Sequence, residues 1–506
     1  MSTMENSSDS MRNKVVKGTG WAILERFGAQ VVSFGVTLVL ARLLTPTDYG
    51  TVALLSVFIL FSNTIVDSGL GQALVQRKDV TVLAVNSVFY TNIAISVFIY
   101  TGLFFAAPVI ARFYAVDGLT MLLRVLAINV IFNAINDVQN ASLSRSMLFR
   151  KSFYIGIITC ITSAMVGITM ALQGYGAWAL VISSVVSNFV GMVARWFIIA
   201  WRPAVMFSFS AVGGLWRFGW KLTISAIIDI LYNNLYALLI GKLYSKADLA
   251  YVSKGRGIPQ FLLDSINVPL GRVVFPAFSR MQCDVERLKN AMRRSLRFVS
   301  FFVFPFMTLC AICADSIVLL LFGDQWGSAV PYVRLACFSM ALLPFHTINL
   351  QAITAMGRSD VFLVLEIIKK MFGLILLLVF IGKGVYMFCL VATFVSGPFS
   401  LLVNAWPNRR FLRYPIHSQI MDVMPALIAS AVMGVFVMVV GCVDCHFVFK
   451  LFMQGVLGLM AYLLFGILFR FGALQESLSM VMPYARRHFP ATLYSKLESI
   501  DIYLCR

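Results

Sequence analysis

Apolar runs of about 20 residues recur along the whole chain and constrain its fold more than any other feature. A run of that length, wound as an α-helix, crosses roughly 30 Å of hydrocarbon. None of the runs shows the ten-residue alternation that is typical of an outer-membrane barrel. With 60% hydrophobic and 12% charged residues among 506, the chain has too few charges to cover a soluble globule. The sequence therefore predicts an all-α, polytopic membrane protein.

The hydrophobic pattern predicts about 14 membrane-spanning helices. We place them at residues 19–41, 49–70, 83–108, 119–140, 154–173, 176–199, 220–241, 247–276, 298–322, 329–354, 361–381, 385–405, 420–441 and 447–469. They form two six-helix lobes, 19–201 and 219–406, with two more helices within 420–469. The segments 1–18, 202–218, 407–419 and 470–506 are then non-spanning. Because residues 1–18 hold no apolar signal-peptide region, the first span itself is expected to direct insertion.

The net charge of +19 is compatible with nucleic-acid binding or with basic loops that fix membrane topology. The distribution of charge favours topology, because more than half of the 41 Lys and Arg residues fall in cytoplasmic segments when both termini are placed inside. We therefore expect both termini in the cytoplasm and no nucleic-acid partner. The same basic clusters would also attract anionic membrane lipids.

A repeated stretch relates the two lobes. The segment ARLLTPTDYG at residues 41–50 corresponds to GKLYSKADLA at 241–250, so that Thr45 matches Ser245 and Asp48 matches Asp248. Gly20 and Trp21 likewise match Gly219 and Trp220. Because six spans separate the copies, both enter the membrane in the same direction. This predicts two parallel, pseudo-symmetric lobes around a central cavity.

Polar residues inside the spans mark the candidate site, because a charge in the bilayer is costly unless it faces protein or water. The eighth span places six polar or small residues on one helical face: Ser253, Arg256, Gln260, Asp264, Asn267 and Gly271. The fourth span has a similar row of amides: Asn129, Asn133, Asn136 and Asn140. For these amides, hydrogen bonding between helices and ligand contact are equal alternatives.

The eleventh span carries Glu366, Lys369 and Lys370 near the bilayer midplane. Glu366 and Lys370 are four residues apart, so a structural pair in which they neutralise each other is one alternative, and Lys369 would still lack an obvious partner. The resulting positive excess suits an anionic group such as a pyrophosphate. The predicted substrate-binding residues are Lys254, Arg256, Gln260, Lys369, Lys370, Arg334, Asn133 and Asn233. The predicted ion-coupling residues are Asp67, Asp229, Asp264 and Glu366.

No catalytic constellation is visible. The chain has four histidines and lacks a P-loop, a nucleophile elbow and a cluster with metal-ligand spacing, so we expect no catalytic residue, no metal and no cofactor. His346 follows Pro344 in the tenth span, where packing beside a kink and proton coupling are both open.

The repeated stretch resembles the polysaccharide transporters of the multidrug, oligosaccharidyl-lipid and polysaccharide exporter superfamily. The resemblance rests on the AR-x-L-x-P-x-DYG turn at 41–50, the FGW-x-L-T segment at 218–223 and the IGK-x-x-S-x-x-x-L-A-x-Y segment at 240–251. It implies a flippase of the bacterial inner membrane that moves undecaprenyl-pyrophosphate-linked oligosaccharides for O-antigen, capsule or exopolysaccharide synthesis. It also implies alternating access coupled to H⁺ or Na⁺, with polysaccharide polymerase and assembly proteins as partners.

Three alternatives stay open at this point. A cation-coupled multidrug exporter of the same superfamily would have an anionic cavity, against which the basic excess argues. A membrane-embedded glycan polymerase or ligase usually has a large outer loop with catalytic residues, whereas the outer loops here are short. A scaffold that does not transport is the third alternative.

Overall fold

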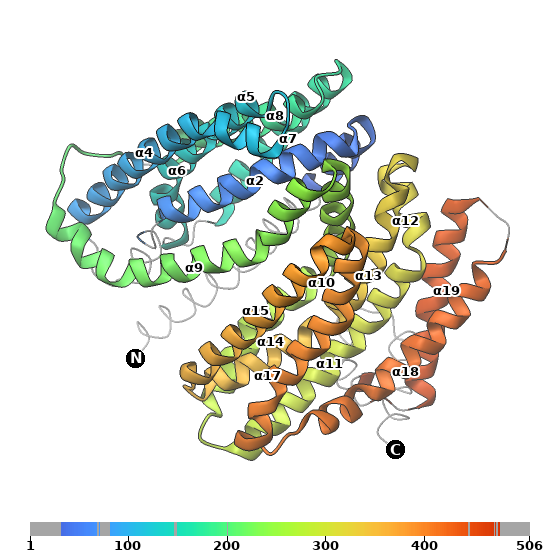
Figure 1. The fold of residues 1–506 in the computed structure, drawn as a ribbon. Helices are drawn as coiled ribbons and strands as arrows, with labels where there is room; N and C mark the ends of the chain where they lie inside the picture. The colour runs from blue at the N-terminus through green and yellow to red at the C-terminus, as the bar shows by residue number, and fades with distance from the viewer. Residues whose placement is uncertain are drawn as a thin grey trace, which may run out of the picture. The chain divides into compact units, whose positions relative to one another are not determined.

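The computed structural model describes residues 32–67, 70, 81–145, 149–199, 201–443, 446–469, 471, 474 and 475. These residues form helices and short connections with no β-strand among them (Figure 1). Eleven helices in the described part are long and apolar enough to cross a membrane. The predicted all-α, multi-pass membrane fold is therefore confirmed.

The number of spans stays a prediction. Of the first expected span only helix Val32–Leu43 is described, and residues 20–31 of the repeated stretch lie outside the described residues, as does most of the tail from 470 onward. Two further expected spans are the long helices α10 (Lys246–Arg280) and α15 (Ser359–Phe380). Both helices carry several charged residues, and neither is among the eleven.

The chain divides into two compact units, Met1–Ala250 and Tyr251–Arg506, with the boundary inside α10. The described helices of the first unit, besides Val32–Leu43 and the start of α10, are α2 (Pro46–Asp67), α4 (Val82–Tyr114), α5 (Leu119–Leu126), α6 (Ile128–Arg145), α7 (Phe149–Leu172), α8 (Ala177–Ile198) and α9 (Phe209–Leu243).

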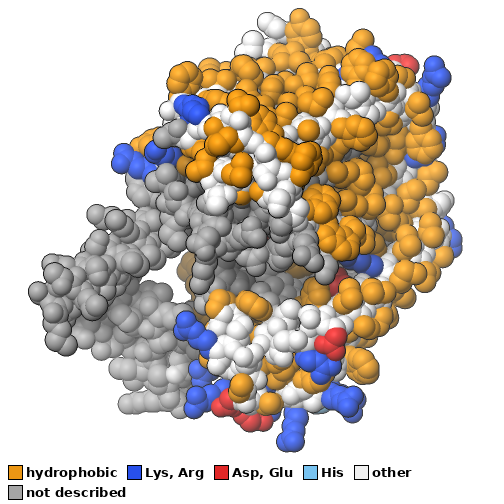
Figure 2. All heavy atoms as spheres, turned by 90° about the vertical axis from the view of Figure 1, so that its left-hand side faces the viewer, with side chains coloured by type: hydrophobic (Ala, Val, Ile, Leu, Met, Phe, Trp, Pro, Cys, Tyr) orange, Lys and Arg blue, Asp and Glu red, His pale blue; other side chains and the backbone are white. Residues whose placement is uncertain are grey.

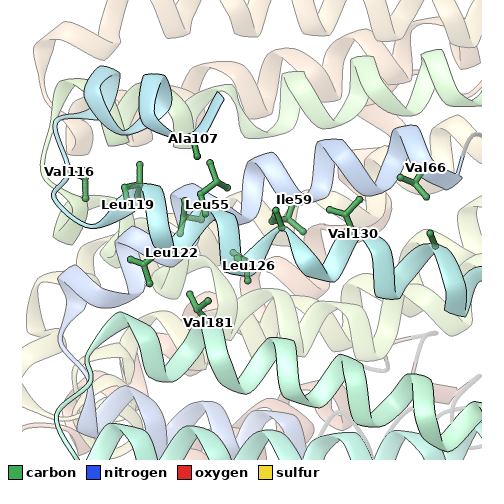
Figure 3. Close-up of a cluster of buried hydrophobic side chains, with 13 residues drawn as sticks. Leu55, Ile59, Val66, Ala107, Val116, Leu119, Leu122, Leu126, Val130 and Val181 are labelled. Atoms are coloured by element: carbon green, nitrogen blue, oxygen red, sulfur yellow. The ribbon is translucent and has the colours of Figure 1, made fainter. Parts of the chain in front are cut away.

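Helix α2 is central to the first unit and contacts α4, α6, α8 and α9 (Figure 1). Its buried Leu55 and Ile59 lie together with Leu122 and Leu126 of α5 and with Val181 of α8 (Figure 3). Lipid tails are as apolar as leucine, so close packing rather than removal from water holds such helices together.

The link between α8 and α9 is fastened to α4. Asn86 Oδ1 accepts a hydrogen bond from the Ala204 amide at 3.1 Å, and Ser87 Oγ accepts one from the Ser208 amide at 2.9 Å. Ser208 in turn caps α9 by accepting from the Ala211 amide. Helix α9 therefore begins at Phe209. The second half of the predicted non-spanning segment 202–218 is thus helical.

The second unit contains the rest of α10 and two groups of helices. The first group is α11 (Val285–Ile312), α12 (Ala314–Phe322), α13 (Val330–Ala341), α14 (Leu343–Ala355) and α15, with the 3₁₀ turn η1 (Asp324–Ala329). The second is α16 (Val385–Val391), α17 (Gly397–Phe411), α18 (Ile416–Val440) and α19 (Phe447–Leu468), with the short turns η2 (Ile381–Lys383) and η3 (Ala392–Ser396). Helix α11 contacts α13, α14 and α18, so it is the centre of this unit.

The repeated stretch forms the same local structure in both copies. Thr45 Oγ1 donates to Asp48 Oδ2 at 2.7 Å, and the Asp48 amide donates back to Thr45 Oγ1 at 3.3 Å. The matching pair repeats this, with Ser245 Oγ to Asp248 Oδ2 at 2.7 Å and the Asp248 amide to Ser245 Oγ at 3.0 Å. Such reciprocal bonds satisfy amides at a helix start, so the stretch is a capping motif that begins α2 and α10.

The two copies also touch. A Cβ on Gly50 would lie 1.8 Å from the carbonyl oxygen of Lys246. Only glycine permits this approach of one helix start to the other.

Large apolar side chains cover much of the surface. Many are more than half exposed, including Phe98, Phe105, Phe197 and Trp406. Figure 2 shows one such apolar area, with Lys and Arg side chains near its edges. An apolar surface of this extent is expected where a protein faces lipid.

Candidate functional site

The polar face of α10 forms as the sequence predicted, because residues three and four apart lie on one side of an α-helix. Arg256 is exposed, Gln260 Nε2 donates to Asp264 Oδ1 at 2.8 Å, and Asn267 Nδ2 donates to Thr347 Oγ1 of α14 at 3.4 Å. The face therefore offers a guanidinium, an amide and a carboxylate in series.

Lys254 lies on a different side of α10 from Arg256. Its ammonium is 5.9 Å from the ring centroid of Phe322 on α12 and is half-buried. The adjacent Gly255 is packed so closely on α13 that a Cβ would lie 2.7 Å from Cβ of Tyr332. Two residues of the predicted substrate set, Lys254 and Arg256, thus have different surroundings.

The charges on α15 pair differently from the prediction. Lys369 Nζ lies 2.5 Å from Glu366 Oε1, with side chains 13% and 26% exposed. Lys369, which was expected to lack an obvious partner, therefore has Glu366 as its partner. Positions three and four residues apart are both neighbours on a helix surface, and the tertiary packing of α15 selects Lys369.

His346 lies close to this pair. Its Nδ1 is 3.0 Å from Asn404 Nδ2 of α17, and it interacts electrostatically with Lys369. Helices α14, α15 and α17 thus bring a histidine, a lysine–glutamate pair and an amide together. Lys370 follows on the same helix and is half-buried.

Arg334 is the remaining cation of the predicted substrate-binding set. It lies on α13, not on α10 or α15 where the other cations of that set lie. Its Nη2 is 2.5 Å from Asp315 Oδ2, and both side chains are more than half exposed. Water and salt weaken such a surface pair. Arg334 therefore has an acidic partner, but the pair is exposed and weak.

In the first unit, predicted residues gather where α2, α4 and α6 meet. Asn92 Nδ2 donates to Asp137 Oδ2 at 2.9 Å, and Asn133 Nδ2 donates to Asn63 Oδ1 at 3.3 Å. The carboxylates of Asp67 and Asp137 interact electrostatically. Asp229 and Asn233 lie on α9, where Asn233 is exposed and Asp229 half-buried.

Sequence reasoning missed a buried polar cluster in the second unit. The carboxylate of Asp422 on α18, 4% exposed, pairs with Arg293 and Arg297 of α11. Tyr414 Oη donates to the same carboxylate at 2.6 Å. Burial raises the pKa of Tyr414 above its ordinary value, so the phenol remains a donor. The available signal was a lone aspartate at the start of an apolar span that follows a basic loop.

A second missed feature is a network of buried amides. Asn408 Nδ2 donates to Asn349 Oδ1 at 2.7 Å, and Asn349 Nδ2 donates to Gln419 Oε1 at 2.9 Å. All three side chains are fully buried. This network ties α14, α17 and α18 together, so its role is to hold the last two spans on the unit.

The family can now be identified. The profile of the polysaccharide biosynthesis protein family matches residues 39–331. The chain belongs to this family. The match begins within the repeated stretch and includes both copies of the capping motif, so the resemblance predicted from these motifs is confirmed.

Two relatives and one solved structure give the closer context. The chain is 29% identical over 333 residues to the succinoglycan biosynthesis transport protein ExoT of Rhizobium meliloti, which is 65% of this chain and 67% of that protein. It is 24% identical over 338 residues to the lipopolysaccharide biosynthesis protein WzxC of Escherichia coli, again 65% and 67%. Its fold is similar to that of the lipid II flippase MurJ in an inward closed conformation, with a TM-score of 0.73 and 14% identity over 88% of this chain and 98% of that one.

Chemically, the described site can hold anions and hydroxyl-rich groups. Arginine, lysine and amide side chains within membrane helices supply hydrogen-bond donors in a medium of low dielectric, where they act strongly. No group of three or more His, Cys, Asp and Glu that could hold a metal occurs among the described residues. The arrangement is suited to binding and release.

Proposed function

We propose that this protein is a flippase that moves lipid-linked oligosaccharides, carried on a polyprenyl pyrophosphate, across the bacterial inner membrane for surface polysaccharide synthesis. The observation that carries the proposal is the exposed Arg256 on a membrane helix, followed along the same face by Gln260. Charged residues within membrane helices typically mark substrate pathways. A pyrophosphate headgroup is a ligand class that a guanidinium binds through charge-assisted hydrogen bonds.

Under this proposal the polar face of α10 binds the substrate headgroup while the lipid tail stays in the bilayer. Arg256, with Lys369, Lys370 and Lys254, would attract the pyrophosphate. Hydrogen bonds to the sugar hydroxyls would come from the side-chain amides of Gln260, Asn133 and Asn233. Arg334 would be a further cation for the anionic headgroup. The lobes would alternate between inward and outward access, with both termini in the cytoplasm.

Ion coupling is the second part of the proposal. Asp67 and Asp137 repel each other, and Asn92 Oδ1 beside them has no hydrogen-bond partner among the described residues. A proton or Na⁺ at this point would relieve the repulsion and use the spare amide oxygen. Asp229, Asp264 and Glu366 are the other coupling candidates, of which Glu366 is held by Lys369.

The test is complementation of a strain that lacks the gene. Surface polysaccharide and the leaflet position of the lipid-linked precursor are measured with the wild type, Arg256→Gln and Lys369→Gln. We expect Arg256→Gln to reduce translocation by about tenfold or more, because a charge-assisted contact is lost. Arg287→Gln is the matched control, since Arg287 is 80% exposed and pairs only with Asp284 among the described residues.

Two outcomes would contradict the proposal separately. Normal surface glycan together with altered drug tolerance in the deletion strain would refute the flippase function. Full complementation by the Arg256→Gln/Lys369→Gln double variant would refute the site while leaving the function in place.

A further inference from the structure

The second unit has a groove that the proposed transport cycle does not use. It is bounded by α15, α17 and the start of α18 and has a volume of about 710 Å³. Its lining is mainly apolar, with Leu365 and Ile368 from α15 and Leu402, Val403 and Trp406 from α17. The lining of the groove is thus chemically suited to a hydrocarbon chain.

One end of the groove is basic. Arg409 and His417 line it there, and Arg409 has no ion-pair or hydrogen-bond partner among the described residues. The acids of α15 are paired with other cations: Asp360 with Arg358 at 2.9 Å and Glu366 with Lys369 at 2.5 Å. Arg409 follows Leu402 by two helical turns, which separates charge and apolar floor by roughly 10 Å at 1.5 Å per residue.

The start of α18 adds donors at the same end. Pro415, Ile416 and His417 line the groove, and α18 begins at Ile416. The first amides of a helix have no partner within it and carry the positive end of its dipole, so they favour an anion. The guanidinium of Arg409 and the start of α18 therefore line the same groove.

The surroundings of the groove are lipid-facing. Leu363, Val364 and Ile367 of α15 are each more than half exposed, and Trp406 is 73% exposed. Tryptophan in such a position is typical of the boundary between hydrocarbon and headgroups. This exposure fits a basic end at headgroup depth and an apolar floor at acyl-chain depth.

We propose that this groove binds one anionic diacyl phospholipid. Its phosphate lies against Arg409 and the first turn of α18, and an acyl chain lies along Leu402 and Ile368. A single free cation matches a phosphodiester, which carries one negative charge, and the order of charge then hydrocarbon matches the order within a phospholipid. Basic pockets between membrane helices are known to select anionic headgroups.

The experiment is native mass spectrometry of the purified full-length protein after exchange into mixed phosphatidylglycerol and phosphatidylethanolamine. The wild type is expected to retain one phosphatidylglycerol, and Arg409→Gln is expected to reduce that retention about tenfold. Arg410→Gln is the matched control, because Arg410 is equally exposed but does not line the groove. It is expected to retain the lipid as the wild type does.

A second pair of variants tests the apolar floor without changing charge. Ile368→Trp fills the groove, whereas Ile367→Trp adds the same side chain to an exposed position outside it. Loss of retention in Ile368→Trp alone would support the site. Equal retention by Arg409→Gln, equal retention of phosphatidylethanolamine, or capture of a polyprenyl pyrophosphate in place of phosphatidylglycerol would overturn it. None of these readouts depends on flipping, so the proposed function can fail or hold independently.

Discussion

The carboxylate of Asp422 on α18 accepts hydrogen bonds from Nε and Nη2 of Arg293 on α11, at 2.7 and 2.8 Å. This two-point contact joins residues 129 positions apart in the sequence. It connects the central helix of the second unit to the first of the last two spans.

We expect Asp422→Ala to lower the free energy of unfolding by about 2 to 3 kcal/mol, because hydrogen bonds to a buried charge are lost and two arginines lose their counter-ion. Thermal unfolding in detergent measures the effect. Asp315→Ala is the control, since the Asp315–Arg334 pair is solvent-exposed and should contribute about 1 kcal/mol or less. Equal effects of the two variants would contradict this assignment.

Asn349→Ala tests the buried amide network. The substitution removes the donor to Gln419 Oε1 and the 2.7 Å acceptor of Asn408 Nδ2, while both side chains stay fully buried and keep only longer bonds to backbone carbonyls. Unsatisfied buried amides cost about 1 to 3 kcal/mol each, so we expect a loss of at least about 2 kcal/mol of stability in the same thermal assay. Limited proteolysis after Phe411 should also become faster, because α18 is less firmly held; an unchanged cleavage rate would argue against that role.

Gly255→Ala and Gly257→Ala form a matched pair on α10. A Cβ at Gly255 would lie 2.7 Å from Tyr332 Cβ and 3.1 Å from the Val333 amide nitrogen, whereas a Cβ at Gly257 meets nothing within 4 Å. We expect Gly255→Ala to destabilise the protein by about 1 to 3 kcal/mol through overpacking. Gly257→Ala should be neutral or stabilising by up to about 1 kcal/mol, because alanine favours helix. Similar melting temperatures for both would show that α10 and α13 are not in close contact.

Asp137→Asn tests the coupling part of the proposed function. The change keeps the shape and a hydrogen-bond partner for Asn92 but removes the repulsion with Asp67. We expect translocation in proteoliposomes to lose its dependence on an imposed H⁺ or Na⁺ gradient while substrate binding is kept. Asn133→Asp is unsuitable as a control because it adds a charge, so Asn140→Ala serves instead: it removes a side-chain hydrogen bond on α6, from Arg195 Nε at 3.0 Å, but no carboxylate. A gradient response equal to the wild type would remove Asp137 from the coupling set.

Much of the fold could be predicted from the sequence, because the bilayer restricts which backbone structures a chain can adopt. A span must be helical throughout, so the length and spacing of apolar runs predict the helices. The repeat at Thr45 and Ser245 predicted equivalent turns, and both form the same capping bonds. Local chemistry suffices there, since the bonds connect residues three apart.

The pairing of polar side chains required the tertiary structure. Helix periodicity allows Glu366 to meet either Lys369 or Lys370, and only the packing of α15 against its neighbours selects Lys369. Likewise, no spacing rule links Asp422 to Arg293 or Asn349 to Gln419, because these contacts join different helices.

The sequence by itself thus determined that the chain is a helical membrane protein and which family it resembles. Only the tertiary structure decided which partners its charged side chains meet, as Lys369 meets Glu366 and Asp422 meets Arg293. The physical reason is that helix formation is governed by contacts within one turn and by the solvent. The state of a buried charge is set by side chains that arrive from other helices.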